Sequence, residues 1–309
     1  MQQHLFKNVA VIEECEVYHD EIKDDKNNPI AHGFLIVPIK SKSILLKDLD
    51  YWRNRHKTQA LKINWKNLSG QNWAPIFGCA RDWLNCCVEG MAKLRYLNRS
   101  NENIERPLGL RFFAIFMKSL NILSDDYWKW DINQEKAIKK FETLLRIGLK
   151  GGLHYLYSPE YQIKINNFVT DAGAFHRPID SRRIINRLNF ELKNYVDLSN
   201  VSTIQSCISD HRKIECIDKD SANLLQLCDL MLGSVSFNCY KSDHKLKLQI
   251  SDNVRKLLDK QKRGRAFERS RHFKTFSISV ADIFENNWKF DQLKTKNPIL
   301  PIQHADLFK

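Results

Sequence analysis

The order of apolar and polar residues along the chain predicts several β-strands. Apolar and polar residues partly alternate over Val9–Tyr18, and the apolar segment Ala31–Ile39 follows after a polar loop rich in turn-forming residues. Such a pair of segments is typical of two strands joined as a hairpin. Further apolar segments predict strands at Leu108–Leu120 and Leu153–Phe168, and a short strand at Val201–Ile208.

Four other segments carry apolar residues at helical spacing. They predict helices over Trp73–Leu97, Asp131–Leu149, Asp180–Asn194 and Ser221–Tyr240. The second of these is followed at once by Gly151 and Gly152, and glycine just after a periodic segment is a signal for the end of a helix.

The succession of these elements predicts an α/β protein with a mixed sheet flanked by helices. Residues 1–240 are predicted to form this main domain, and residues of about 41–106 a helical insert within it. That stretch is rich in tryptophan, with Trp52, Trp65, Trp73 and Trp83. Residues 241–309 are predicted to form a basic, helical C-terminal extension.

The charge of the chain points to a polyanionic partner. The 309 residues contain 49 Lys and Arg against 36 Asp and Glu, a formal net charge of +13. Such an excess is typical of proteins that bind nucleic acid. The segment Lys241–Lys274 holds twelve basic and four acidic residues, a local excess of +8, and includes Phe267 and Phe273. We expect its basic side chains to contact phosphates and its phenylalanines to stack on bases.

The basic side chains predicted to bind nucleic acid cluster at the end of this segment. They are Lys260, Lys262, Arg263, Arg265, Arg269, Arg271 and Lys274. The alternative is a solvated helix face, because the sequence VRKLLDKQK also has ordinary amphipathic spacing.

Several classes of protein do not fit the sequence. No apolar stretch approaches the roughly 18 residues of a membrane-spanning helix, and the N-terminal segment turns acidic where a signal peptide is apolar. We therefore expect a cytoplasmic protein without a membrane partner. The 8 cysteines form no C-x-x-C pair and no cluster with zinc-ligand spacing. They are interpreted as small buried apolar residues.

Acidic residues mark the candidate chemistry. Asp20 and Glu21 end the first predicted strand, Asp229 interrupts an otherwise apolar helix, and Asp218 precedes that helix. Carboxylates that converge from separate elements are what a Mg²⁺ or Mn²⁺ site requires, and such ions act on phosphodiesters. The alternatives are that Asp20 and Glu21 begin a loop and that Asp218 caps the helix.

These motifs resemble the domain of unknown function 3800 family, whose members look like ribonuclease-H-like proteins. The family has Asp-Glu-Ser-Gly after its first strand, where this chain has VYHDEIKD, so Ile22 and Lys23 depart from the motif. Its late signature corresponds to IDKDSANLLQLCDLMLGSVS, with Asp218 and Asp229 at the acid positions. The segment LKINWKNLS, with Lys62 and Trp65, resembles a Lys-Trp segment of relatives.

The resemblance spans roughly residues 9–240 and includes one departure in the expected metal site. The family tends to place an aspartate at the end of the fourth strand, where this chain has Asn166, and Asp171 lies five residues further on. Asparagine offers a carbonyl oxygen to a metal but no negative charge. Either Asp171 serves instead, or the site is weakened.

The resemblance implies a ribonuclease-H-like fold and metal-dependent hydrolysis of phosphodiesters in nucleic acid, and it suggests a role in phage defence or in a mobile element. The implied catalytic acids are Asp20, Glu21, Asp218 and Asp229. The implied ligands of Mg²⁺ or Mn²⁺ are Asp20, Asp218 and Asp229, with Asp171 or Asn166. The alternatives are a catalytically impaired nucleic-acid-binding or regulatory subunit, and a scaffold whose Trp-rich insert contacts a protein partner or a second copy of the chain.

Overall fold

The computed structural model of the chain describes most of the sequence. The described residues are 11–23, 29–69, 73–92, 108–117, 133–156, 161–172, 180–193, 196–216, 218–239, 244–264, 268, 273–284 and 287–292.

Eight strands form one mixed sheet in the order β5-β4-β1-β2-β3-β7-β8, and β6 pairs with β4 beside this path. The strands β1, β2 and β3 are antiparallel neighbours, whereas β4 runs parallel to β1 and β7 runs parallel to β3. The bounds are β1 Val11–Lys23, β2 Pro29–Pro38, β3 Arg111–Met117, β4 Tyr161–Asp171, β5 Val196–Asp197, β6 Gln205–Cys207, β7 Phe276–Phe284 and β8 Asn287–Gln292.

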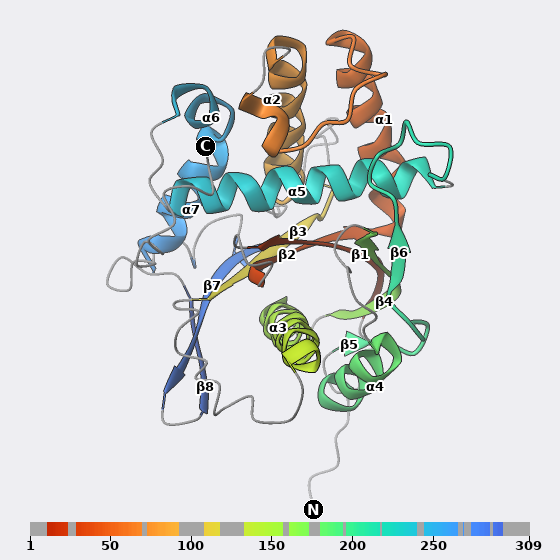
Figure 1. Ribbon diagram of the computed structural model, residues 1–309, viewed down its shortest axis with the longest axis vertical. Coiled ribbons are helices and arrows are strands. Elements are labelled where there is room, and N and C mark those ends of the chain that lie inside the picture. The colour runs from red at the N-terminus through yellow and green to blue at the C-terminus, as the bar shows by residue number, and fades with distance from the viewer. Residues whose placement is uncertain are drawn as a thin grey trace, which may run out of the picture.

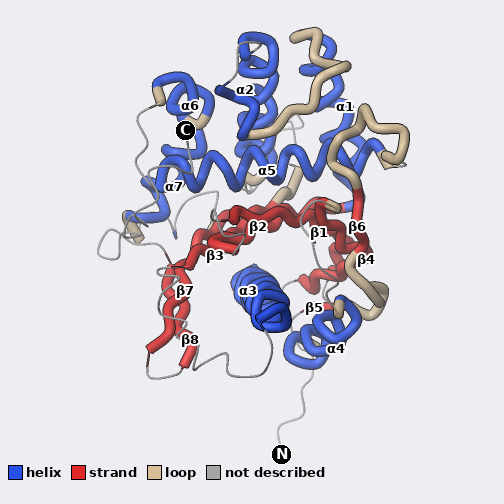
Figure 2. Tube along the Cα trace, viewed as in Figure 1, coloured by secondary structure: helices blue, strands red, loops and turns tan. Residues whose placement is uncertain are grey.

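Helices cover both faces of this sheet. The helices α1, α2, α5, α6 and α7 lie on one face, and α3 and α4 lie on the other, around which the sheet curls (Figures 1 and 2). The bounds are α1 Ile39–Arg55, α2 Trp73–Gly90, α3 Asn133–Leu156, α4 Ser181–Leu192, α5 Lys219–Cys239, α6 Lys245–Ile250 and α7 Asp252–Lys262, with a short 3-10 helix η1 at Lys66–Ser69. The expected α/β class with a mixed sheet flanked by helices is confirmed.

Helix α5 packs closely on the centre of the sheet. Its Cys228 Sγ lies 3.4 Å from the backbone oxygen of Tyr18 in β1 and 3.6 Å from that of Gly33 in β2. A Cβ atom at Gly33 would come within 3.0 Å of Leu232 Cβ. Small residues at this contact therefore let the helix backbone approach the two strands, and this fixes where the side chains of α5 point.

The hairpin of β1 and β2 is confirmed, but the C-terminal part of the sheet was not predicted. The prediction of a helical extension over residues 241–309 differs from the structure, since this segment adds β7 and β8 to the sheet after α6 and α7. Phe276, Ile278 and Val280 alternate with polar residues and are buried. This period of two was a strand signal, which the basic segment before it obscured.

The helices α1 and α2 connect β2 to β3, within the stretch where helices were predicted. The Trp83 indole of α2 is buried and donates to the backbone oxygen of Leu49 in α1, at 3.0 Å. That these helices form an insert stays a prediction, as does a domain boundary at residue 240. No helix in the described part of the chain is long and apolar enough to span a membrane.

The prediction that Gly151 and Gly152 end a helix is wrong, because α3 continues to Leu156. Packing against the sheet, and not a turn at the end of the helix, explains the glycine at position 152. A Cβ atom at Gly152 would lie 1.9 Å from the Phe113 ring of β3, whereas one at Gly151 would meet nothing within 4 Å. Gly152 is therefore required where the helix touches the sheet.

Alanine at these two adjacent positions is expected to change stability in opposite directions. Gly152→Ala forces a buried ring to move and should lower the free energy of unfolding by about 1–3 kcal/mol. Gly151→Ala adds helix propensity at an exposed position and should raise it by about 0.5–1 kcal/mol. Urea denaturation of the two single variants measures both values. Equal effects of the two substitutions would contradict the packing explanation.

Candidate functional site

Two acidic residues lie side by side on neighbouring strands of the sheet, Asp171 at the end of β4 and Asp20 three residues before the end of β1. In the parallel pair of β1 and β4, His19 is opposite Thr170, so Asp20 and Asp171 follow side by side. Neighbouring strands are about 4.8 Å apart. His19 and Thr170 bond to each other on the α3 face. Because successive side chains alternate between faces, Asp20 and Asp171 point to the face that carries α5.

Helix α5 brings a third acid to this point. The backbone N–H of Trp65 donates to Asp229 Oδ2 at 2.7 Å, and the Asp20 carboxyl is hydrogen-bonded to the Asp229 carboxylate. Both aspartates are half-buried, so part of each remains accessible. The structure therefore brings Asp20, Asp171 and Asp229 together from three separate elements.

The charges at this site are not balanced. Burial, followed by the charges of Asp229, Glu21 and Asp171, raises the pKa of Asp20 well above its usual value. Burial also raises the pKa of Asp229, against the opposing effects of the Trp65 N–H and of Lys62. These effects favour the protonated form of Asp20 over its ionised form, and the Asp20 carboxyl is the one that donates in its hydrogen bond with Asp229.

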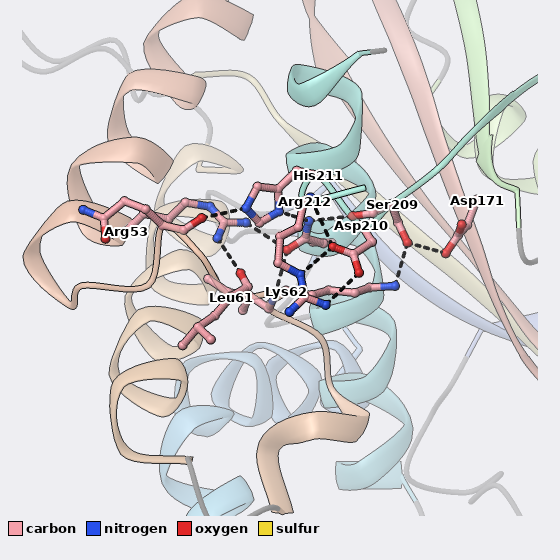
Figure 3. A network of polar contacts seen from close by, with 11 residues as sticks. Arg53, Leu61, Lys62, Asp171, Ser209, Asp210, His211 and Arg212 are labelled. Atoms are coloured by element: carbon pink, nitrogen blue, oxygen red, sulfur yellow. Dashed lines mark hydrogen bonds and ion pairs between the residues drawn. The ribbon is translucent and has the colours of Figure 1, made fainter. Parts of the chain in front are cut away.

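A short chain of hydrogen bonds connects Asp171 to a lysine (Figure 3). The Ser209 hydroxyl, which follows β6, donates to Asp171 Oδ2 at 2.6 Å and accepts from Lys62 Nζ at 2.9 Å. Ser209 is buried and Lys62 is half-buried. The lysine thus adds a positive charge at the edge of the three acids.

One glutamine holds the two loops of the site on α5. Gln226 Oε1 accepts from the backbone N–H of Ile63 at 2.8 Å and from Arg53 at 2.9 Å, and Gln226 Nε2 donates to the backbone oxygen of Ser209 at 2.6 Å. Asp229 lies one helical turn further along α5 and binds Trp65. The Leu-Gln-Leu-x-Asp-Leu segment therefore supplies one acid and also the support that positions Lys62 and Ser209.

Glu21, predicted to join the catalytic acids, lies on the other face of β1. It is opposite His32 in the register of β1 and β2, and its Oε1 forms an ion pair with Lys23 at 3.0 Å. Burial is the main cause that raises the pKa of Glu21 to about 7. Its Oε2 is buried without a hydrogen-bond partner. The structure therefore does not place Glu21 beside Asp229.

Two histidines are buried on that same face. His19 Nδ1 lies 2.9 Å from Thr170 Oγ1, and His19 Nε2 lies 2.9 Å from His32 Nδ1. The rings pack against Phe34 and Phe141, and neither histidine is more than 1% exposed. These groups form a polar row inside the core under α3, separated by the sheet from the three acids.

Asn166, the alternative to Asp171 as a metal ligand, points elsewhere. The pairing of β1 with β4 shifts at this residue, which is skipped between Ile165 and Asn167. Such a bulge re-aims a side chain, and Asn166 Oδ1 accepts from Asn200 Nδ2 at 2.9 Å. Of the two alternatives, the geometry thus favours Asp171 as the acid of β4.

Asp218, also predicted as a ligand and catalytic acid, caps α5. Its Oδ1 accepts from the backbone N–H of Ser221 at 2.9 Å and its Oδ2 from the Ser221 hydroxyl at 2.6 Å. Burial acts in the opposite direction, but these bonds hold the pKa of Asp218 below its usual value. Both of these hydrogen bonds are those of a helix cap, the alternative role predicted for Asp218.

Removal of this cap is expected to affect stability rather than chemistry. Asp218→Ala should lower the free energy of unfolding by about 1 kcal/mol, whereas Asp218→Ser keeps a capping oxygen and should lower it by less. Both variants should retain the Mn²⁺ response proposed below. Chemical denaturation and Mn²⁺-dependent thermal shift measure the two effects, and a lost Mn²⁺ response in both variants would restore Asp218 as a ligand.

The predicted nucleic-acid-binding residues are only partly described. Lys260 and Arg263 are exposed at the end of α7. Lys262 is half-buried at the same place, and the Lys274 ammonium lies 4.9 Å from the centre of the Tyr155 ring. Arg265, Arg269 and Arg271 lie outside the described residues.

The amphipathic alternative for this segment also has support, because α7 buries an apolar side that includes Leu257 and Leu258. On its exposed side Arg255 and Lys256 pair with Asp252 of the same helix.

The described side chains of the three acids do not take up the positions of ligands around one ion. Among the described residues, no group of three or more His, Cys, Asp or Glu side chains is placed to coordinate one ion. Asp20 and Asp229 are instead hydrogen-bonded to each other. Their oxygens are of the type that Mg²⁺ and Mn²⁺ prefer, and a cation would relieve the repulsion that raises the pKa of Asp20.

Comparison of the chain with known protein families, with curated proteins and with solved structures finds no match in any of the three.

Proposed function

We propose that the protein is a metal-dependent, nuclease-like phosphodiester hydrolase of ribonuclease-H-like fold. The observation that carries the proposal is the convergence of Asp20, Asp171 and Asp229 from β1, β4 and α5. The family that the sequence resembles likewise arranges acids from a first strand, a middle strand and a late helix around one point. The resemblance also suggests a role in phage defence or in a mobile element.

The three aspartates are the residues that would hold Mg²⁺ or Mn²⁺. The bound ion would supply Lewis-acid stabilisation of the charge that develops on the phosphodiester oxygens. Asp20 must release its proton before it can serve as a ligand, so the affinity for the cation should rise with pH. Ser209 orients the Asp171 carboxylate, and the Trp65 N–H orients that of Asp229.

Nucleic acid is the substrate class that the charge favours. The net charge is +13, and exposed cations such as Lys260 and Arg263 lie on the segment that follows α5. Backbone phosphates bind such side chains without regard to base sequence.

The proposal is tested by cleavage of labelled single-stranded DNA, duplex DNA, RNA and an RNA–DNA hybrid with Mg²⁺ or Mn²⁺. The parent should cut at least one of these substrates, and Asp229→Ala should not. Asp220→Asn, which removes an exposed acid of the same helix, is the matched control and should behave as the parent does. Equal cleavage by Asp229→Ala and the parent, or none by either, would overturn the catalytic proposal.

The alternative is a catalytically impaired subunit that binds nucleic acid without cutting it. The observation in its favour is that Asp20 and Asp229 are hydrogen-bonded to each other and have a lysine nearby, which partly satisfies the acids without a metal. It predicts salt-sensitive binding of DNA or RNA with no Mn²⁺-induced thermal shift. A Lys260→Ala/Arg263→Ala variant should then show a smaller salt dependence, while Arg182→Ala, an exposed cation of α4 on the opposite side of the sheet, should not.

A further inference from the structure

We propose that Lys62 is a substrate-contacting residue whose ammonium binds a backbone phosphate of the nucleic acid at the edge of the three acids. The inference rests on the proposed function, because it assigns the substrate's phosphate a place beside Asp20, Asp171 and Asp229. It adds a residue from the connection between α1 and η1 to a site otherwise made by the sheet and α5.

The backbone around Lys62 is fixed from two sides. Gln226 accepts the N–H of Ile63, and Asp229 accepts the N–H of Trp65. Both acceptors belong to α5, so the segment that carries Lys62 is held on the helix that supplies the third acid. On its other side, Arg53 donates to the backbone oxygen of Leu61 at 2.9 Å. Lys62 therefore keeps a fixed position relative to Asp229.

The ammonium of Lys62 has unused capacity. A lysine ammonium has three donors, and within the described part of the chain that of Lys62 makes one hydrogen bond, to Ser209 Oγ at 2.9 Å. It reaches Asp171 only through that hydroxyl. Because Lys62 is half-buried, part of the side chain faces solvent. A phosphate oxygen is the partner that two free N–H donors beside a cation-binding site would favour.

A second lysine shows what a purely structural counter-charge looks like in this protein. The charges of Lys62 and Lys247 both act on Asp229. Lys247, however, is only 5% exposed, and its ammonium lies 5.2 Å from the centre of the Trp65 ring. Lys247 is therefore covered, whereas Lys62 is open to a ligand.

Substitution of Ser209 distinguishes two possible roles of Lys62, which are binding of phosphate and positioning of Asp171. It donates to Asp171 and accepts from Lys62, so it is a positioning residue for the acid. If Lys62 acted only through Ser209 on Asp171, Ser209→Ala would reproduce the loss caused by Lys62→Met. If Lys62 binds phosphate, Ser209→Ala should raise the Mn²⁺ concentration required and recover when Mn²⁺ is saturating.

The first measurement is binding, which needs no catalysis. A fluorescein-labelled single-stranded DNA oligonucleotide is titrated in Ca²⁺ at several salt concentrations. Lys62→Met should weaken binding about tenfold and lower the slope of log affinity against log salt by about 0.7, the value for one phosphate contact on a single strand. Lys62→Arg should keep the slope of the parent. Unchanged binding by Lys62→Met, or no binding by the parent, overturns the inference.

The second measurement is cleavage of the same oligonucleotide with saturating Mn²⁺. Lys62→Met should lower kcat/KM at least about 100-fold, the scale of one electrostatic contact in a transition state, and Lys62→Arg should retain most of the activity. The Mn²⁺-induced thermal shift should persist in Lys62→Met, because Lys62 is not a ligand. Lys150→Met, the control, removes an exposed lysine of α3 on the opposite face of the sheet and should leave kcat/KM unchanged.

The two measurements separate the failure of this inference from that of the proposed function. If binding depends on Lys62 but no Mn²⁺-dependent cleavage occurs, the hydrolase proposal is contradicted and the phosphate contact of Lys62 is supported. If cleavage depends on Asp229 and is unchanged in Lys62→Met, the hydrolase proposal is supported and the phosphate contact of Lys62 is contradicted. Equal losses in Lys62→Met and Lys62→Arg, or in Lys62→Met and Ser209→Ala at saturating Mn²⁺, would also overturn the role proposed for Lys62.

Discussion

Asp20→Asn is expected to raise the stability of the metal-free protein at pH 7.5 and to abolish its response to Mn²⁺. The asparagine removes an acid whose ionised form is disfavoured by burial and by Asp229. Asparagine keeps a donor for the Asp229 carboxylate, so the hydrogen bond can persist. The gain should be about 1–2 kcal/mol, the usual range when strain at a functional site is removed. Thermal unfolding with and without Mn²⁺ measures both effects.

The pH dependence of this gain follows from the direction of the shift. Because the pKa of Asp20 is raised in the folded protein, its contribution to stability is fully present below the unfolded value of about 4. That contribution is lost as the pH rises through the folded pKa. The gain in free energy of unfolding from Asp20→Asn should therefore be absent near pH 4 and grow toward neutral pH. A series of denaturation experiments from pH 4 to pH 8 measures it.

The control for this variant is Asp220→Asn, which makes the same chemical change at an exposed acid of α5. It should leave the stability and the Mn²⁺ response close to those of the parent. If the Asp20→Asn protein is less stable than the parent at pH 7.5, the ionised Asp20 carboxylate is not the source of instability that we infer. A Mn²⁺ shift that survives Asp20→Asn would remove Asp20 from the ligands.

The sequence was sufficient to find Asp20 and Asp229 because each breaks a local pattern. Asp20 follows the apolar part of an alternating strand, and Asp229 interrupts an apolar helix, so both are costly unless they have a partner. Their meeting depends on the packing of α5 on β1 and β2, which small residues such as Cys228 and Gly33 permit. No periodicity in the chain encodes that contact.

Other residues of the site depend on register, which the sequence did not reveal. A shift at Asn166 turns this residue toward Asn200 and leaves Asp171 beside Asp20. In the same way, the strict alternation along β1 sends Glu21 to the face opposite Asp20, although the two are adjacent in sequence. Two acids that are adjacent within a strand thus supply one side chain to each face of the sheet.

The support of the site was also invisible in the sequence. Ser209 and Gln226 are ordinary polar residues within their segments, and their partners are distant in the chain. Gln226 binds Ile63, which lies 163 residues away, and Ser209 binds Lys62, which lies 147 residues away. One signal was available in the sequence. An otherwise apolar helix contains a glutamine one turn before an aspartate, and a buried amide requires hydrogen-bond partners.

Acidification is expected to destabilise the fold through the buried pair His19 and His32. Burial lowers the pKa of His32 to about 3, with a further contribution from Lys23, and it lowers the pKa of His19 well below its usual value. His32 is therefore neutral in the folded protein at pH 5, and burial favours the neutral form of His19 as well, whereas an unfolded histidine titrates near pH 6.5. Their stabilising contribution is present above about pH 6.5 and is lost as the pH falls below it.

The size of this effect can be isolated with His32→Asn, whose side-chain amide can replace the Nδ1 contact to His19 but does not titrate. A histidine that stays neutral in the folded protein contributes about 1.4 kcal/mol per pH unit below 6.5, so His32 should account for about 2 kcal/mol between pH 7 and pH 5. The fall in the free energy of unfolding over that interval should shrink by this amount in the variant. His154→Asn, at an exposed position of α3, should leave the fall unchanged. An identical fall in the His32→Asn protein would mean that His32 is protonated inside the core, which requires an acceptor beside its Nε2, an atom that is buried without a hydrogen-bond partner.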